Sequence, residues 1–242
     1  MLLLLSLIIT LGISYAEEIG IDVYYPVHLA QFQCMKELGY SLAIVRGYIS
    51  DGAIDKNAKE TLQDAAFAGL KHDAYHFPCV GGVSPADQVN KIVDYLGNLP
   101  QIYWVIVGTN TNLGCGWQDM NTNCGFLHNL VSDFQGRGVQ VGIASSYYMW
   151  NTIFGGPNNC NQFSNLQLWY ADYDGQQNFS DFQSFGGWKS PNIKQYNLNG
   201  SLWEIPVNFD WYPWIGIINA SIWIQFIIFP TLRFRGGVAK TS

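Results

Sequence analysis

The amino-acid sequence predicts an α/β protein built as a single TIM-like (β/α) barrel. Short apolar runs alternate with segments of helical periodicity along most of the chain, and this alternation is typical of a parallel sheet covered by helices. At 242 residues, the chain has a length at which barrels often form one domain. A doubly wound open sheet is the alternative, but the sequence has neither a glycine fingerprint after its first strand nor a phosphate-binding loop.

The expected strands are runs rich in β-branched and aromatic residues. The most apolar of them reads QIYWVIV, as expected of a strand buried on both faces. In chain order the strands cover Ile19–Tyr24, Ser41–Tyr48, Leu70–Phe77, Gln101–Val107, Val139–Ala144, Leu166–Ala171, Ile193–Asn197 and Pro206–Asp210.

The expected helices lie between the strands, and two of them have recognisable ends. Gly39 ends the first helix as a C′ glycine would. Ser84 is placed to cap the third helix, whose first position is Pro85. In chain order the helices cover Ala30–Leu38, Asp55–Ala68, Pro85–Leu96, 121–135 and 146–153. In such a barrel, functional side chains are expected at the carboxyl ends of the strands.

The charge content of the chain excludes two classes of protein. Only 12% of the residues are charged, roughly half of the usual quarter, so the chain does not have the composition of a disordered protein. The formal net charge is −6 and there is no basic cluster, so nucleic acid is not expected as a partner.

The N-terminus has the pattern of a secretory signal peptide covering residues 1–16. An apolar run, LLLLSLIITLGI, is too short to span a bilayer. The small-x-small sequence Ser14-Tyr15-Ala16 follows and predicts cleavage after Ala16. An uncleaved N-terminal anchor is the alternative. We therefore expect secretion, or delivery to the endolysosomal lumen.

The C-terminal residues 214–242 form a hydrophobic tail. Residues 211–232 contain no charged side chain, and Arg233, Arg235 and Lys240 follow them. This order fits one membrane span with a cytoplasmic tail, which would make the chain a type I membrane protein attached through this segment alone. A buried terminal hairpin and a tail foreign to the native chain are the alternatives.

Five cysteines favour disulfides, because their spacing does not suit zinc. Cys115 and Cys124 are close enough in the chain for a bridge between them to close a short loop. An odd number leaves one thiol that is free, intermolecular or without its original partner.

Polar and aromatic side chains near strand ends suggest a sugar-binding site. Asp22 lies within an apolar strand, where a carboxylate is costly unless it is paired or functional. Aromatic faces and amides suit sugar rings and hydroxyls, and the candidate residues of these types are Tyr75, His76, Trp169, Tyr170 and Gln195. The four histidines lack metal-ligand spacing, so no metal is expected, and the absence of Gly-x-Ser-x-Gly excludes the nucleophile-elbow hydrolases. No cofactor is expected either.

From about Ile19 to Pro213 the chain resembles the family 25 glycoside hydrolase lysozymes, the Chalaropsis-type muramidases, and most of all their invertebrate and amoebal branch. The motifs that carry the resemblance are GIDV (20–23), FQCMKELGYSLAIVRGY (32–48), DAYHFPC (73–79), GCGW (114–117), LWYADYD (168–174), FGGWKSPNIKQY (185–196) and VNFDWYP (207–213). The resemblance implies a flattened, irregular barrel over residues 17–213, with a glycan groove at the strand carboxyl ends. It further implies hydrolysis of the β-1,4 bond between N-acetylmuramic acid and N-acetylglucosamine in peptidoglycan.

The family site is acidic, and this chain departs from it. Asp22 matches the first-strand Asp of the family. On the fourth strand, where Trp104 joins the expected glycan-binding residues, Ile106 and Gly108 replace an Asp-x-Glu pair. Asn208 replaces a last-strand Asp, with Asp210 two residues on, and Trp203 takes the place of a cysteine.

Two functions remain open at this point. The first is a lysozyme that acts in cell-wall breakdown or defence with a rearranged site, using Asp22 with Asp210 or Asp73. The second is a monomeric glycan-binding barrel with weak or no activity, because a glycosidase needs a carboxyl group to protonate the leaving oxygen.

Overall fold

The fold is described for residues 7–10, 13–109, 115–217 and 221–224 in a computed structural model, and it divides into two units. Residues 17–214 form the larger unit. The smaller unit, residues 1–16 and 215–242, contains a two-stranded antiparallel sheet of β1 (Leu7–Thr10) and β11 (Ser221–Ile224).

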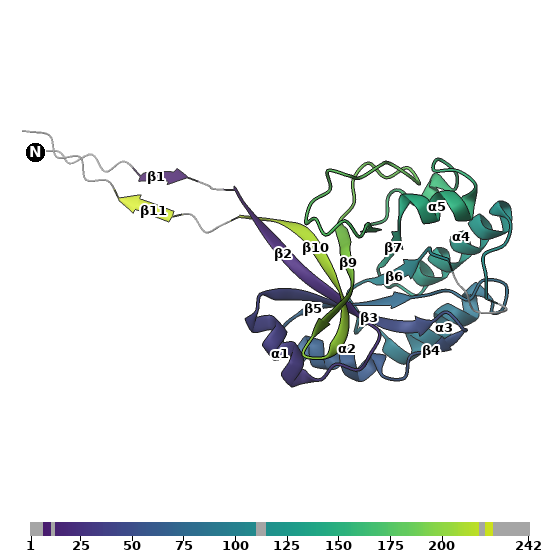
Figure 1. Cartoon of the computed structure of the whole chain (residues 1–242), viewed down its shortest axis with the longest axis horizontal. Helices are drawn as coiled ribbons and strands as arrows, with labels where there is room; N and C mark the ends of the chain where they lie inside the picture. The colour runs from purple at the N-terminus through teal and green to yellow at the C-terminus, as the bar shows by residue number, and fades with distance from the viewer. Residues whose placement is uncertain (1–6, 11–12, 110–114, 218–220, 225–242) are drawn as a thin grey trace, which may run out of the picture. The chain divides into compact units, whose positions relative to one another are not determined.

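Eight strands close into a barrel in the larger unit, which confirms the predicted fold class (Figure 1). Around the ring the order is β2, β10, β9, β8, β7, β6, β5 and β3, and pairing of β2 with β3 completes the circle. The strands are β2 (Ile13–Val23), β3 (Tyr40–Ile49), β5 (Lys71–His76), β6 (Tyr103–Ile106), β7 (Val141–Ser145), β8 (Leu168–Ala171), β9 (Ile193–Leu202) and β10 (Ile205–Ile217). The short β4 (Ala53–Ile54) extends β3.

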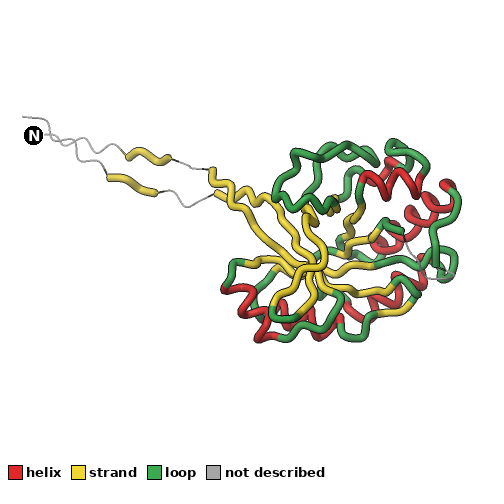
Figure 2. Tube along the Cα trace, in the orientation of Figure 1, coloured by secondary structure: helices red, strands yellow, loops and turns green. Residues whose placement is uncertain are grey.

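The described residues form five α-helices, which flank these strands (Figure 2). Ser84 accepts a hydrogen bond from the Asp87 backbone N–H, so it caps α3 as predicted. Ser146 caps α5 in the same way through the Met149 N–H. The helices are α1 (Leu29–Glu37), α2 (Ala58–Phe67), α3 (Pro85–Leu96), α4 (Met120–Gly136) and α5 (Tyr147–Phe154), and a 3₁₀ turn covers Asn161–Phe163.

Alternation along each strand divides the buried side chains into two layers. One layer fills the barrel interior and consists of Leu42, Ile44, Tyr75, Trp104, Ala144, Trp169, Ile193 and Tyr212. The other packs between the strands and the helices and includes Ile21, Val45, Tyr103, Leu127 and Phe134. Residues that are adjacent along a strand therefore face opposite layers: Tyr103 faces the helices and Trp104 faces the barrel interior.

The sheet is not parallel throughout, which corrects one expectation. β9 and β10 are antiparallel, with Leu202 paired to Ile205. Only Trp203 and Glu204 connect them, and both have positive φ, 49° and 66°. A turn of two residues reverses the chain into a hairpin, whereas parallel strands need a long crossover. The two expected strands at 193–197 and 206–210 are thus the arms of one longer hairpin.

The sequence suggested a disulfide between Cys115 and Cys124, and this prediction is wrong. Cys79 pairs with Cys115, and Cys124 pairs with Cys160. Cys79 and Cys115 follow the adjacent strands β5 and β6, so the barrel brings their loops together. Cys34 is the free thiol and is exposed.

Both ends of the chain enter strands. β2 begins at Ile13, inside the predicted signal peptide, and β10 continues to Ile217, inside the predicted tail. Residues 1–6, 11–12, 218–220 and 225–242 of these two segments lie outside the described residues. In the part of the chain that is described, no helix has both the length and the apolar character needed to cross a membrane.

Candidate functional site

A cavity of about 640 Å³ lies where the barrel strands end. Strands β2, β5, β6, β7 and β8 each contribute residues at or next to their carboxyl ends to its wall. Other segments, most of them following these strands, complete it. The lining residues are Asp22, Tyr75, Phe77, Ile106, Val107, Gly108, Thr109, Ala144, Ser145, Ser146, Tyr147, Tyr148, Met149, Trp169, Tyr170, Ala171, Asp172, Tyr173, Asp181, Gln183, Gln195, Leu198 and Asn208. This position agrees with the general location of ligand sites in (β/α) barrels.

Asp22 is the most buried carboxyl group in the cavity wall, with 3% of its surface exposed. Both of its oxygens accept hydrogen bonds from amides: Gln195 Nε2 at 2.5 Å and Asn208 Nδ2 at 2.9 Å. Asn208 Oδ1 accepts the Asn199 backbone N–H, which turns its amide nitrogen toward Asp22. Burial raises the pKa of Asp22 to about 6, although the two amide hydrogen bonds oppose this rise.

Two further carboxyl groups lie buried in the barrel but do not line the cavity. Asp210 accepts a hydrogen bond from Trp169 Nε1 at 2.8 Å. Burial and the nearby charge of Asp22 raise the pKa of Asp210 well above its ordinary value. Asp73 accepts hydrogen bonds from Trp104 Nε1 and the Ile102 N–H. The sequence analysis considered a catalytic pair of Asp22 with Asp210 or with Asp73. In either pair, only Asp22 lines the cavity.

Ile106 and Gly108 line the cavity together. The first is the last residue of β6 and the second lies two residues later, in the segment that follows the strand. A Cβ atom built on Gly108 would meet only Ile106 Cγ2, at 3.5 Å, which is an ordinary contact. The position thus has room for a side chain, and the sequence provides none.

Of the six residues predicted to bind glycan, the structure brings four to the cavity: Tyr75, Trp169, Tyr170 and Gln195. His76 lies elsewhere, stacked on Tyr48 and bonded to Gln88 of α3. It is fully buried on the helix side of β5, because its neighbour Tyr75 takes the inward position. Trp104 fills the barrel interior, where it donates to Asp73 and leaves no room for a Cβ at Gly142.

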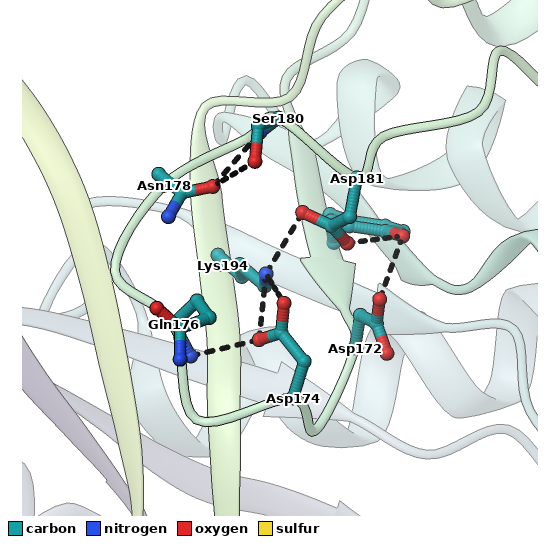
Figure 3. Close-up of polar contacts among 8 residues, drawn as sticks. Asp172, Asp174, Gln176, Asn178, Ser180, Asp181 and Lys194 are labelled. Atoms are coloured by element: carbon teal, nitrogen blue, oxygen red, sulfur yellow. Dashed lines mark hydrogen bonds and ion pairs between the residues drawn. The ribbon is translucent and has the colours of Figure 1, made fainter.

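The segment after β8 forms an acidic wall, which the sequence reasoning missed (Figure 3). Lys194 Nζ contacts Asp174 at 2.8 Å and Asp181 at 2.9 Å. Hydrogen bonding to Asp181, together with burial, raises the pKa of Asp172. Burial opposes ionisation of Asp181, but Asp172 and Lys194 together lower its pKa to about 2. The motif LWYADYD contained Asp172 and Asp174 but not Asp181, and its spacing alone did not show that Asp172 faces a cavity.

Metal-binding geometry is limited in the described residues. Oxygens of Asp172, Asp174 and Asp181 lie within 4.8 Å of one another. The Lys194 ammonium already contacts two of these three carboxylates. His28, Glu60 and Asp64 form a second such group, which lies outside the cavity wall. Neither group supports a catalytic metal in the cavity.

Two exposed aromatic side chains at the cavity were also missed. Tyr148 of α5 is 67% exposed and Tyr173 is 52% exposed, and both line the cavity. The Tyr173 hydroxyl donates to Gln195 Oε1, so this ring is tied to the residue that binds Asp22. No strand-end rule pointed to them, because Tyr148 lies in the first turn of α5 and Tyr173 lies two residues after the end of β8.

Comparison with known proteins identifies the lineage of this site. A family model described as Lysozyme-like protein 1 matches residues 14–196. A curated relative, Probable GH family 25 lysozyme 4 of Dictyostelium discoideum, is 36% identical over 222 residues, covering 88% of this chain and 98% of the relative. The chain belongs to the family 25 glycoside hydrolase lysozymes. This confirms the resemblance found in the sequence motifs.

Other relatives of this lysozyme-like chain agree. Lysozyme-like protein 5 of Caenorhabditis elegans is 32% identical over 205 residues, covering 80% of this chain and 90% of the relative. The structure of a family GH25 lysozyme from Aspergillus fumigatus aligns with a TM-score of 0.67 and 16% identity, covering 81% of this chain and 94% of the other. At that identity the likeness supports the barrel fold alone.

Proposed function

We propose that this lysozyme-like protein binds peptidoglycan-type glycan in the cavity and hydrolyses it weakly or not at all. The observation that carries the proposal is the cavity wall at Ile106 and Gly108, where the family resemblance expects an Asp and a Glu. Hydrolysis requires a carboxyl group that donates a proton to the leaving oxygen. Asp22 is held by two amide donors instead of facing a second carboxyl at these positions.

The remaining cavity supports binding. Tyr75, Trp169 and Tyr173 offer aromatic surface to sugar faces, and Gln195 and Asn208 offer amides to polar groups. Loss of an acid or base group typically lowers the rate by about 10²–10⁴, whereas binding contacts of this kind do not depend on that group. We therefore expect the protein to bind glycan even though it hydrolyses glycan slowly or not at all.

The test restores the missing carboxyls. Ile106→Asp with Gly108→Glu is expected to raise the rate of bacterial cell-wall clearing by about 10²-fold or more, since it returns the acid to a position with room for it. Turbidity of a cell-wall suspension measures the rate. Sedimentation with insoluble peptidoglycan measures binding, which we expect for the unmodified chain and the double variant alike.

The matched control is Gly125→Glu, which adds the same side chain on α4 where nothing lies within 4 Å. It should bind as the unmodified chain does and clear no faster. Rapid clearing by the unmodified chain would overturn the weak-activity proposal, and failure to sediment with peptidoglycan would overturn the binding proposal.

A second candidate function is slow hydrolysis with Asp172 as the proton donor. Asp172 lines the same cavity as Asp22, and the neighbouring Asp181, together with burial, raises the pKa of Asp172. Slow clearing by the unmodified chain that disappears in Asp172→Asn would favour this candidate. Slow clearing that persists in that variant would reject it.

Secretion, or delivery to the endolysosomal lumen, is part of the proposal. The cleavage pattern at Ala16 and the two disulfides support it, because disulfides persist in oxidising compartments. We further propose that the barrel acts as a monomer, and that any membrane attachment resides in residues 211–232 and not in the barrel.

A further inference from the structure

The loop between β8 and β9 contains a tripeptide that the binding of glycan in the cavity does not explain. The pattern Asn-x-Ser, with any middle residue except proline, is the acceptor for N-linked glycosylation in secreted proteins. It occurs at Asn178, Asn199 and Asn219, and the last of these lies outside the described residues. Because so short a pattern also arises by chance, the surroundings of each acceptor in the fold are the stronger evidence.

The Asn178 side chain is open at the atom that glycosylation modifies. Its Oδ1 accepts hydrogen bonds from the Ser180 backbone N–H at 3.0 Å and from the Ser180 hydroxyl at 2.5 Å. Its Nδ2 points away from Ser180 and donates no hydrogen bond among the described contacts (Figure 3). An N-linked glycan replaces one hydrogen of Nδ2 and leaves Oδ1 a carbonyl oxygen. The contacts that Asn178 makes in the folded chain are therefore compatible with the modification.

The loop that carries this tripeptide lies at the surface and is anchored through its middle residue. Residues 172–192, which connect β8 to β9, contain neither a helix nor a strand. The half-buried Phe179 ring packs edge-on against Trp211 of β10, with 4.9 Å between the ring centroids. On either side of it, Ser180 is exposed and Asn178 is partly exposed. A glycan on Asn178 therefore leaves the packed contact of the loop in place, and surface loops are where such acceptors are used.

The second described tripeptide has a different setting, within the hairpin of β9 and β10. Asn199 is exposed, but its φ is 57° and its backbone N–H donates to Asn208 Oδ1. The middle residue, Gly200, packs so closely on Phe209 that an added Cβ would lie 2.1 Å from the ring. A tripeptide paired into a hairpin is withdrawn from an enzyme that binds its acceptor as a single strand. The structure therefore favours the acceptor in the β8–β9 loop.

We propose that Asn178 is a site of N-linked glycosylation. The donor is an oligosaccharide linked through C1 of N-acetylglucosamine to a polyprenyl pyrophosphate. Asn178 Nδ2 forms a bond to C1, the bond from C1 to the phosphate oxygen breaks, and the pyrophosphate leaves with the electron pair. The amide proton passes to a base of the transferase. The modification rests on the secretion that is part of the proposed function, and it places a glycan on the loop that supplies Asp172, Tyr173 and Asp181 to the cavity wall.

The experiment expresses the full chain in a eukaryotic secretory host and recovers the protein from the medium. Digestion with a peptide N-glycosidase in water labelled with oxygen-18 converts each glycosylated Asn to a labelled Asp, which peptide mass spectrometry locates. We expect the label at residue 178. Ser180→Ala should abolish that label, and Ser180→Thr, which keeps the hydroxyl, should retain it. The matched control is Ser190→Ala, the same exchange at an exposed serine of the same loop outside any such tripeptide, and it should leave the label unchanged.

Two results would overturn the assignment of Asn178 alone. One is protein from the medium that carries no label at residue 178, whether or not Asn199 is labelled. The other is a label at residue 178 that persists in Ser180→Ala, since it would not depend on the tripeptide. In both cases, secretion and sedimentation with peptidoglycan would leave the proposed function standing. A chain that stays in the cytosol without glycan would overturn the proposed secretion and, with it, this inference.

Discussion

At the scale of single residues, the direction of a side chain from its strand decides its role. Tyr75 and His76 are adjacent in the sequence, yet one lines the cavity and the other packs against Tyr48 and Phe134 on the helix side. The same alternation places Asp22, Asp73 and Asp210 in the barrel interior, where burial raises the pKa of each. Such carboxyls cost stability when they are ionised.

We predict a pH-dependent cost for Asp73, whose pKa is raised to about 6, chiefly by burial. Between about pH 4 and pH 6 the native chain keeps a proton that the unfolded chain has lost, so the contribution of Asp73 to the free energy of unfolding falls as pH rises, by about 3 kcal/mol in all. In urea unfolding across this range, the free energy of unfolding of Asp73→Asn should therefore increase relative to that of the unmodified chain as pH rises.

His76 has the opposite effect, because burial lowers its pKa to about 3. Because His76 is present in both Asp73→Asn and the unmodified chain, its contribution cancels in the difference between their free energies of unfolding. Asp133→Asn is the control and should run parallel to the unmodified chain. A constant difference between Asp73→Asn and the unmodified chain from pH 4 to pH 7 would contradict the prediction.

At the scale of elements, the connections between strands and helices fix the wall of the cavity. The Trp203–Glu204 turn forces β10 back along β9, and this brings Asn208 to Asp22. Cys79–Cys115 joins the segments after β5 and β6, and Cys124–Cys160 joins α4 to the segment after α5. Each bridge spans 36 residues of sequence.

Removal of the Cys124–Cys160 bridge should destabilise the barrel. A loop of this length contributes about 3–4 kcal/mol through the entropy of the unfolded chain. The double variant Cys124→Ala with Cys160→Ala should lose most of this free energy of unfolding in denaturant titrations. Cys34→Ala is the control, since that thiol is free and exposed. Equal stability of the double variant and the control would contradict the assigned pairing.

At the scale of the whole molecule, the barrel of residues 17–214 contains both buried clusters. The parallel pairing of β2 with β3 uses Ile19–Val23, and Glu18 accepts a hydrogen bond from Tyr212. Cleavage after Ala16 would therefore leave the closing contacts of the barrel intact.

We predict that the secreted protein begins at Glu17. Expression of the full chain in a eukaryotic secretory host, followed by N-terminal mass analysis of protein from the medium, checks this. Ala16→Arg should block or shift the cleavage, because small residues are needed there. Retention of residues 1–16 in the mature protein would instead support an uncleaved anchor.

Much of the fold could be predicted from the sequence. The apolar runs and helix ends placed each α-helix and five of the barrel strands within a few residues, because periodicity and capping are local properties. The strands β2, β9 and β10 extend beyond the predicted runs, β2 at its start and the other two at their ends. The hairpin at Trp203–Glu204 was missed, since neither residue is a usual choice for positive φ. Four of the six residues predicted to bind glycan line the cavity. The other two do not, because His76 points to the helix side of its strand and Trp104 lies deeper in the barrel interior.

The sequence by itself determined the family and the barrel, because motifs and residue types are written along the chain. It also supplied the hypothesis that Ile106 and Gly108 replace an Asp-x-Glu pair. Only the tertiary structure decided which cysteines pair, that Asn208 and Gln195 hold Asp22, and that Asp172, Asp181 and two tyrosines share its cavity. Those relations join residues far apart in the chain, and barrel closure sets their distances.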